Sequence, residues 1–131
     1  MNRVLVKDKI KDLSVLFIDD EKIVIDIMKE ILPMLFKEAY YALDGVEGIN
    51  QFKMNEPDII ITDLSMPKLD GIEMIKEIKI LNENIKVICI SGHNEHSEID
   101  KCLALGCTYI VKPISSTVLF KAFEEILDIT E

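Results

Sequence analysis

The sequence predicts an α/β domain in which a parallel sheet is covered by helices on both faces. Short apolar runs alternate five times with segments whose apolar residues recur at helical spacing. The run PDIIIT at 57–62 is apolar almost throughout, which is typical of a strand with both faces buried. At 131 residues the chain is long enough for one domain with a proper core, and no linker, repeat or low-complexity tract divides it.

Each expected strand is a short run of five or six mainly apolar residues, several of them rich in β-branched or aromatic side chains. The expected strands cover residues 14–18, 39–43, 57–62, 85–90 and 107–111. A segment with an apolar stripe follows each one, which predicts a helix packed on the sheet. The expected helices cover residues 21–36, 44–54, 71–81, 94–106 and 115–129.

Local signals set several helix ends. Pro33 lies late in the first helical segment and predicts a kink or an early end, because proline lacks a backbone N–H. Gly106 suits a helix C-cap, and the serines and threonine at 115–117 suit an N-cap. Residues 1–12 precede the first strand as an N-terminal extension, either a short helix or a loose arm, and residues 13–131 form the domain itself.

Composition excludes several function classes. The net charge of −9 argues against nucleic-acid binding by this domain, because a phosphate backbone requires a basic face. No apolar run is long enough to span a membrane, and the start of the chain lacks the apolar stretch of a secretory signal. Cys89, Cys102 and Cys107 lack metal-ligand spacing, so we expect buried structural cysteines, reduced in the cytoplasm.

Polar side chains follow the apolar strands where each strand ends. Asp19 and Asp20 follow the first expected strand and Asp63 the third, while Ser91 and Lys112 follow the fourth and fifth. Parallel strands share one C-terminal edge, where ligands of such sheets bind, so these side chains should lie together. Carboxylates this close repel one another unless a cation joins them, and oxygen ligands favour Mg²⁺.

Each of these features is ordinary when taken alone. An Asp-Asp pair after a strand is more often a helix cap, and Ser91-Gly92 is typical of a turn. Lys112-Pro113 is typical of a strand exit, and Tyr109 of a core or half-buried aromatic. Their joint occurrence at the ends of the correct strands is what favours a ligand site.

Four motifs, VLFIDDE, DIIITDLSMPKLDG, VICISGH and YIVKPI, make the chain strongly resemble the receiver domain of bacterial two-component response regulators, the CheY-like superfamily. The resemblance extends over about residues 13–129. It implies a flavodoxin-like (βα)5 doubly wound fold with strand order 2-1-3-4-5. It also implies that Asp63 accepts a phosphoryl group, that Asp20, Asp63 and the backbone carbonyl of Ser65 ligate Mg²⁺, and that Asp19 acts on the metal through water.

The resemblance assigns further roles around the phosphoryl group. Lys112 would hold one phosphoryl oxygen and Ser91 another, and Tyr109 would change rotamer on activation. Phosphorylation would remodel the surface formed by helix 4, strand 5 and helix 5, and hydrolysis of the acyl phosphate would reverse the change. The Lys112–Pro113 peptide bond would be cis.

Several neighbouring residues have expected supporting roles. Pro67 fixes the loop over Asp63, Gly71 allows a close approach or an unusual backbone angle, and Asp70 caps the following helix. The resemblance implies that the side chains of Ser65 and His93 tune the rate at which the phosphoryl group is lost. Phe120 or Phe123, on the last helix, would contribute to a dimer or partner surface in addition to the core.

The implied partners are a sensor histidine kinase or phosphotransfer protein and a downstream effector domain or protein, with a homodimer through helix 4, strand 5 and helix 5 as a further arrangement. The chain would be a signalling protein that catalyses only its own phosphoryl transfer and dephosphorylation. Direct nucleic-acid and membrane binding are not expected.

Three other interpretations remain. A phosphatase of the haloacid dehalogenase type also uses an aspartate after a strand but needs a second acid two residues later, where this chain has Ser65. A flavin- or dinucleotide-binding domain needs a glycine- or hydroxyl-rich loop after the first strand, where this chain has DDEKIV. A receiver-like interaction module that is never phosphorylated is the third, and the complete set of acids together with Lys112 argues against it.

Overall fold

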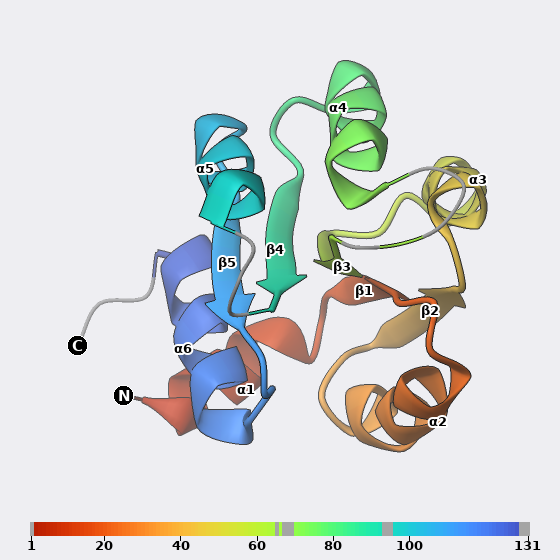
Figure 1. The fold of residues 1–131 in the computed structure, drawn as a ribbon. Coiled ribbons are helices and arrows are strands. Elements are labelled where there is room, and N and C mark those ends of the chain that lie inside the picture. Colours follow the sequence, from red (N-terminus) through yellow and green to blue (C-terminus); the bar gives the residue numbers. More distant parts are fainter. Residues whose placement is uncertain (1, 65, 67–69, 93–95, 129–131) are drawn as a thin grey trace.

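The computed structural model describes residues 2–64, 66, 70–92 and 96–128. Five parallel strands form one sheet in the order β2-β1-β3-β4-β5, which confirms the predicted doubly wound fold and strand order (Figure 1). The strands are β1 (Ser14–Ile18), β2 (Glu38–Ala42), β3 (Ile59–Asp63), β4 (Lys86–Ser91) and β5 (Thr108–Val111). Because β1 pairs with both β2 and β3, the order of strands reverses there, as at the ligand-binding edge of related sheets.

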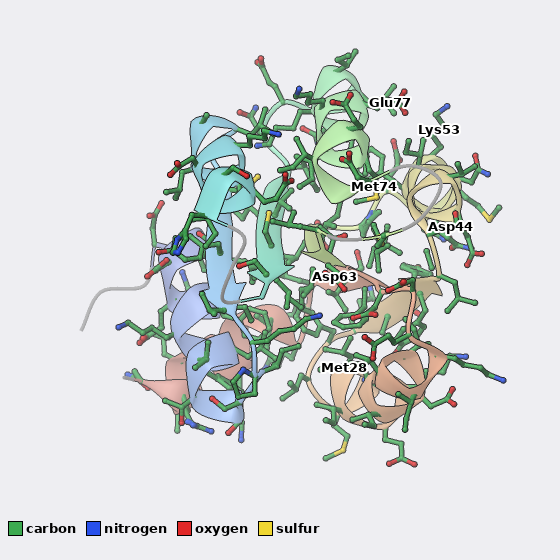
Figure 2. The ribbon with its side chains drawn as sticks, viewed as in Figure 1. Met28, Asp44, Lys53, Asp63, Met74 and Glu77 are labelled. Atoms are coloured by element: carbon green, nitrogen blue, oxygen red, sulfur yellow. The ribbon has the colours of Figure 1, made fainter. Side chains whose placement is uncertain are left out.

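Helices cover both faces of the sheet (Figure 1). The helices are α1 (Arg3–Ile10), α2 (Lys22–Ile31), α3 (Gly45–Asn55), α4 (Gly71–Leu81), α5 (His96–Ala104) and α6 (Ser116–Ile126). Met28 of α2 and Met74 of α4, both labelled in Figure 2, belong to separate buried clusters on opposite sides of the sheet. None of the helices in the described part of the chain is long and apolar enough to cross a membrane.

The sequence signals at helix ends agree with the structure. The α-helix α2 ends at Ile31, and Pro33 lies in the 3-10 turn η1 (Leu32–Met34), as the missing N–H of proline requires. Gly106 follows α5 with φ +79°, a left-handed conformation that favours glycine. Ser115 caps α6 by accepting a hydrogen bond from the N–H of Val118 at 3.2 Å.

The N-terminal extension is a helix that contributes to the core. Val6 and Ile10 of α1 are completely buried and pack in the same cluster as the apolar face of α6. The Arg3 guanidinium lies 5.0 Å from the centre of the Phe120 ring and donates a hydrogen bond to Thr117 at 2.9 Å. The alternative of a loose arm is therefore wrong.

The two phenylalanines of α6 are not available to a partner. Phe120 is 4% exposed and Phe123 is 0% exposed, and their rings meet edge to face. Arg3 lies over Phe120, and Phe36 packs edge to face on Phe123 at 5.6 Å. The expectation that either residue forms part of a dimer or partner surface is therefore wrong. The sequence alone could not show that the N-terminal extension covers this part of α6.

Candidate functional site

The C-terminal edge of the sheet gathers three carboxylates. A carboxylate oxygen of each of Asp19, Asp20 and Asp63 lies within 4.8 Å of the others, and we call these three residues the carboxylate cluster. Asp63 is the last residue of β3, and Asp19 and Asp20 follow β1, the adjacent strand. Figure 2 shows Asp63 near the centre of the molecule, at the end of its strand.

The backbone continues the sheet beyond its strand ends and so fixes the cluster. The N–H of Asp19 donates to the carbonyl of Ala42 at 3.1 Å, and the N–H of Leu64 donates to the carbonyl of Ile90 at 3.2 Å. The first bond ties Asp19 to β2. The second ties Leu64, the residue after Asp63, to β4. The carboxylates are therefore held by rigid backbone at a strand end rather than by a free loop.

Asp19 is a buried acid. Its side chain accepts a hydrogen bond from the N–H of Glu21 at 2.8 Å, and the residue is 2% exposed. Burial raises the pKa of the Asp19 carboxyl to about 6, against that opposing hydrogen bond and with a further contribution from the Asp63 charge. Without a cation, the carboxylate cluster therefore carries an electrostatic cost that falls largely on Asp19.

Lys112 brings a positive charge to the cluster. Its Nζ lies 3.4 Å from Oδ2 of Asp63, whose side chain is only 4% exposed, while the lysine side chain is 41% exposed. Burial lowers the pKa of Lys112, but Asp63, Asp19 and Glu21 together raise it by more, so the net shift is upward. The ammonium therefore stays protonated beside the acids.

Lys112 is placed by both backbone and covalent geometry. Its N–H donates to the carbonyl of Ser91 at 2.8 Å, which joins the end of β5 to the end of β4. The Lys112–Pro113 peptide bond is cis. Lysine and serine thus reach the same edge from adjacent strands.

Ser91 carries a buried hydroxyl without a hydrogen-bond partner among the described residues. The residue is 0% exposed, and its Oγ makes no hydrogen bond within the part of the chain that the structure describes. A buried hydroxyl is normally paired, and unpaired polar atoms in a native fold call for a reason. A ligand oxygen near the end of β4 would supply the missing partner.

Three supporting residues lie next to Asp63. A Cβ at Gly71 would lie 2.7 Å from the carbonyl oxygen of Asp63 and 2.8 Å from Cα of Leu64, so glycine is needed for close approach and not for an unusual backbone angle. Asp70 caps α4 by accepting from the N–H of Glu73 at 2.9 Å, as predicted. Thr62, which sequence reasoning treated only as a strand residue, is buried and donates to the carbonyl of Asp63 at 2.8 Å.

Other predicted site residues are placed elsewhere or not described. Tyr109 lies on β5, 38% exposed, in a surface groove that α5, β5 and α6 share. Ser65, Pro67 and His93 lie outside the described residues. The metal contact through the carbonyl of Ser65, the loop role of Pro67 and the tuning roles of the Ser65 and His93 side chains therefore stay predictions.

The donor set at this edge fits a hard divalent cation. Mg²⁺ prefers oxygen ligands and is usually held by one or two carboxylates together with water. The carboxylate cluster supplies three carboxylates within reach of one another, and a divalent ion would favour the charged form of Asp19, which burial and the Asp63 charge disfavour. Asp20, which is exposed, would be open to an ion arriving from solvent.

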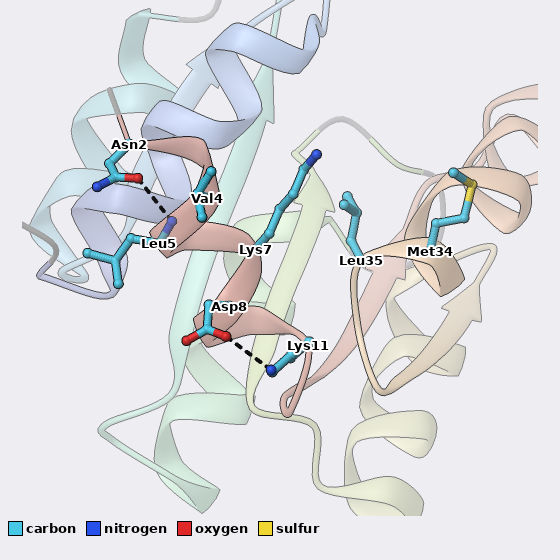
Figure 3. A pocket seen from close by; sticks show the side chains of 8 residues that line it. All are labelled: Asn2, Val4, Leu5, Lys7, Asp8, Lys11, Met34 and Leu35. Carbon is cyan, nitrogen blue, oxygen red and sulfur yellow. Dashed lines mark hydrogen bonds and ion pairs between the residues drawn. The ribbon is translucent and has the colours of Figure 1, made fainter.

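A surface pocket on the described residues lies away from the carboxylate cluster. It is formed by α1 and the segment after α2, and Figure 3 shows its eight lining residues. Its charged side chains Asp8 and Lys11 pair with each other at 3.0 Å and are both more than half exposed. Because no buried polar group converges on it, this pocket lacks the anchoring groups of a specific ligand site.

Comparisons with known proteins agree with the geometry. The family model of the response regulator receiver domain matches residues 15–124. The chemotaxis protein CheY of Treponema pallidum is 34% identical over 120 residues, covering 86% of this chain and 81% of that protein. Sporulation initiation phosphotransferase F of Bacillus subtilis is 26% identical, covering 87% of this chain and 93% of that protein.

Solved structures of similar proteins have the same fold. A response regulator receiver domain protein from Clostridium thermocellum superposes with a TM-score of 0.82 at 29% identity, covering 88% of this chain and 94% of that one. CheY of Borrelia burgdorferi, in a complex with CheX, BeF3 and magnesium, superposes with a TM-score of 0.79 at 28% identity, covering 88% of this chain and 89% of that one.

Proposed function

The chain belongs to the response regulator receiver domain family of two-component signalling, and we propose that it is a phosphorylation-dependent switch with Asp63 as the phosphoacceptor. The observation that carries the proposal is the buried Asp63 carboxylate, with Lys112 at 3.4 Å and two further acids beside it. This arrangement offers a nucleophile, a fixed positive charge and ligands for a metal on one rigid strand edge.

Mg²⁺ is the proposed cofactor, as for receiver domains in general. Asp20, Asp63 and the backbone carbonyl of Ser65 would hold the ion, with Asp19 acting through water, and Mg²⁺ when bound would neutralise charge on the phosphoryl oxygens. The clustering of Asp19, Asp20 and Asp63 within 4.8 Å supports this assignment.

The proposed reaction transfers a phosphoryl group from a phosphohistidine. An oxygen of the Asp63 carboxylate attacks phosphorus, a new O–P bond forms, and the N–P bond breaks with its electron pair returning to the imidazole nitrogen, which then takes a proton. Lys112 would stabilise the negative charge on a phosphoryl oxygen, and its raised pKa keeps it cationic for this purpose. Water attack on the resulting acyl phosphate would return Asp63 to its original state.

Ser91 and Tyr109 would carry the change outward. The Ser91 Oγ, buried and unpaired among the described residues, gains a hydrogen-bond partner if it moves towards a phosphoryl oxygen. Tyr109, partly exposed on the adjacent strand β5, would then turn into the space that Ser91 leaves. The surface so changed is formed by α5, β5 and α6, which correspond to helix 4, strand 5 and helix 5 of the family because α1 precedes the first strand here.

The proposed partners follow from this surface and this chemistry. A sensor histidine kinase or phosphotransfer protein would supply the phosphoryl group at the strand edge. A downstream effector, or a second copy of the chain, would bind the α5–β5–α6 surface, where Leu103 is 52% exposed beside Tyr109. The CheX–CheY complex of Borrelia burgdorferi is an example of a similar protein bound to a partner.

Phosphorylation with a small donor tests the proposal. The reduced protein is incubated with acetyl phosphate and Mg²⁺, and the intact mass is measured for wild type, Asp63→Asn and the matched control Asp26→Asn, which alters an exposed acid on α2. We expect one phosphoryl adduct in wild type and in Asp26→Asn, and none in Asp63→Asn or after chelation of Mg²⁺. If wild type gains no adduct from acetyl phosphate or from a phosphohistidine donor, the chain is a receiver-like interaction module instead.

A further inference from the structure

Three cysteines, separated in the sequence, meet beneath α5. The Sγ atoms of Cys89, Cys102 and Cys107 all lie within 4.8 Å of one another, and we call these residues the thiol cluster. The residues are 0%, 0% and 5% exposed, respectively, and none forms a disulfide. They lie in the apolar layer that α3, α4 and α5 form with the sheet, away from the carboxylate cluster.

A helix-end motif places two of the three thiols together. The N–H of Cys107 donates to the carbonyl of Cys102 at 3.1 Å, and the N–H of Gly106 donates to the carbonyl of Leu103 at 3.0 Å. These two bonds, with Gly106 in the left-handed conformation, form a Schellman motif. The motif turns the chain back on the last turn of α5, so the two cysteines become neighbours despite their spacing.

The third thiol comes from the sheet. Cys89 lies on β4 directly opposite Tyr109 of β5. Tyr109 follows Cys107 by two residues in the sequence. The Cys89 side chain belongs to the same buried cluster as the other two thiols. A strand, a helix and a helix-end turn therefore contribute one sulfur each.

The spacing fits a thiophilic metal ion. A metal–sulfur length of about 2.3 Å places the sulfurs of a trigonal or tetrahedral site about 3.7 to 4.0 Å apart. Sulfurs within 4.8 Å of one another reach that separation with small side-chain shifts. We propose that the thiol cluster is a binding site for one soft divalent cation of the Zn²⁺ type, held by the three thiolates and fixing α5 to the sheet.

The surroundings balance the charge that such binding creates. Three thiols release three protons as Zn²⁺ binds, which leaves a Zn(SR)₃ group of charge −1. The Lys79 ammonium lies near enough to act on the Cys107 thiol electrostatically. The Lys79 charge would offset the −1 charge of that group.

The packing of α5 explains both access to the site and its consequence. Cys102 is the one fully buried residue of α5 among those described. A helix attached so lightly opens at low free-energy cost, which admits an ion to the buried sulfurs. Once bound, the ion would tie that same residue to Cys89 of β4 and so restrain α5. This inference does not depend on phosphorylation of Asp63.

Cadmium titration of the reduced protein tests the inference. The full chain is freed of reductant without oxygen and titrated with Cd²⁺ in excess Mg²⁺, and the ultraviolet charge-transfer absorption of cadmium thiolate is followed. We expect saturation at one equivalent, displacement by Zn²⁺, and slower amide exchange in α5 of the loaded protein. Cys102→Ala and Cys107→Ser should each weaken binding by at least about 100-fold, since losing a direct ligand exceeds the effect of losing a supporting group.

The controls separate this site from the acids. Asp20→Asn, which alters the carboxylate cluster, should bind Cd²⁺ at the thiols as wild type does. Folding of each variant is checked by circular dichroism, and the wild-type titration decides the matter alone if the cysteine variants do not fold. The inference is overturned if folded wild type shows no thiolate absorption, shows it only under unfolding conditions, or gains no exchange protection in α5, or if folded Cys102→Ala retains full affinity.

Discussion

The carboxylate cluster and the thiol cluster each hold three ligand atoms within 4.8 Å, but in opposite environments. The carboxylate cluster lies at the open edge of the sheet, includes the exposed Asp20, and has the ammonium of Lys112 beside it. The thiol cluster lies between the sheet and α5, surrounded by apolar side chains. The carboxylate cluster therefore has one member open to solvent, Asp20, whereas all three thiols are shielded from it.

The two clusters differ in their effect on the stability of the metal-free protein. Neutral thiols pack as small apolar groups, so the thiol cluster contributes to the metal-free core. Burial first, and the neighbouring Asp63 charge second, raise the pKa of the Asp19 carboxyl, so its ionised form carries a cost in the metal-free protein. A bound cation would offset this cost, which the apolar surroundings of the thiol cluster do not impose on neutral thiols.

Removal of a direct oxygen ligand should give the largest contrast between the clusters. Asp20→Asn should weaken Mg²⁺ binding by more than about 100-fold, because even supporting groups of a metal site contribute about 10- to 100-fold. Isothermal titration calorimetry measures the effect, with Asp26→Asn as the matched control. Unchanged Mg²⁺ affinity in Asp20→Asn would remove this residue from the metal site.

The backbone support of the carboxylate cluster should be sensitive to a single methyl group. Gly71→Ala places a Cβ 2.7 Å from the carbonyl oxygen of Asp63, and backbone atoms there cannot move aside as a flexible side chain would. We expect the free energy of unfolding to fall by about 1 to 3 kcal/mol, as for other overpacked sites. Urea denaturation followed by circular dichroism checks this, and an unchanged midpoint would show that β3 and α4 are less tightly joined.

Neutralising Asp19 should reveal the cost of its buried charge as a pH effect. The carboxyl has a folded-state pKa of about 6 against an ordinary value of 3.8, so the folded protein binds more protons between these values. The stability of the metal-free protein should therefore fall as pH rises from about 4 to about 6. Asp19→Asn should flatten this slope and raise the stability at pH 7 by about 1 to 2 kcal/mol.

The same measurement in Mg²⁺ sharpens the result. A bound cation compensates the Asp19 charge, so the advantage of Asp19→Asn should shrink or reverse when Mg²⁺ is added. Chemical denaturation at several pH values, with and without Mg²⁺, supplies both comparisons. If wild type and Asp19→Asn have parallel pH profiles without metal, the buried carboxyl carries no such cost.

Substitution of Gly106, whose turn supports the thiol cluster, should have the smallest effect on the free energy of unfolding. Gly106 has φ +79°, but a Cβ there would have no heavy atom within 4 Å, so only backbone strain opposes substitution. Gly106→Ala should lower the free energy of unfolding by about 1 kcal/mol, less than Gly71→Ala. A loss equal to or larger than that of Gly71→Ala would show that the end of α5 is held more firmly than its packing indicates.

The sequence predicts the fold and the carboxylate cluster well for one reason. Strand and helix periods are local, and parallel strands necessarily bring their C-terminal ends to one edge. Asp63 and Lys112 therefore meet although 49 positions separate them, and the structure places them 3.4 Å apart. The limits of β1 are those expected, and the limits of the other strands differ by at most two residues, because pairing with neighbours rather than composition ends a strand.

The thiol cluster and the role of α1 could not be predicted in the same way. Cys102 and Cys107 lack metal-ligand spacing, and only the turn around Gly106 makes them neighbours. The sequence predicts that turn from a glycine after a helix. Whether the turn brings the side chains of Cys102 and Cys107 together depends on the exact length of the helix. Similarly, the burial of Val6 depends on where α6 lies, which no local pattern in residues 1–12 contains.

Mapping the modified residue is the most direct test of the central claim, that Asp63 accepts the phosphoryl group. Protein treated with acetyl phosphate and Mg²⁺ is reduced with borohydride, which converts phosphoaspartate to homoserine, then digested and sequenced by mass spectrometry. The account predicts homoserine at position 63 alone, and only when Mg²⁺ was present. Homoserine at Asp19 or Asp20, or at no position in a protein that gained a phosphoryl group, would contradict it.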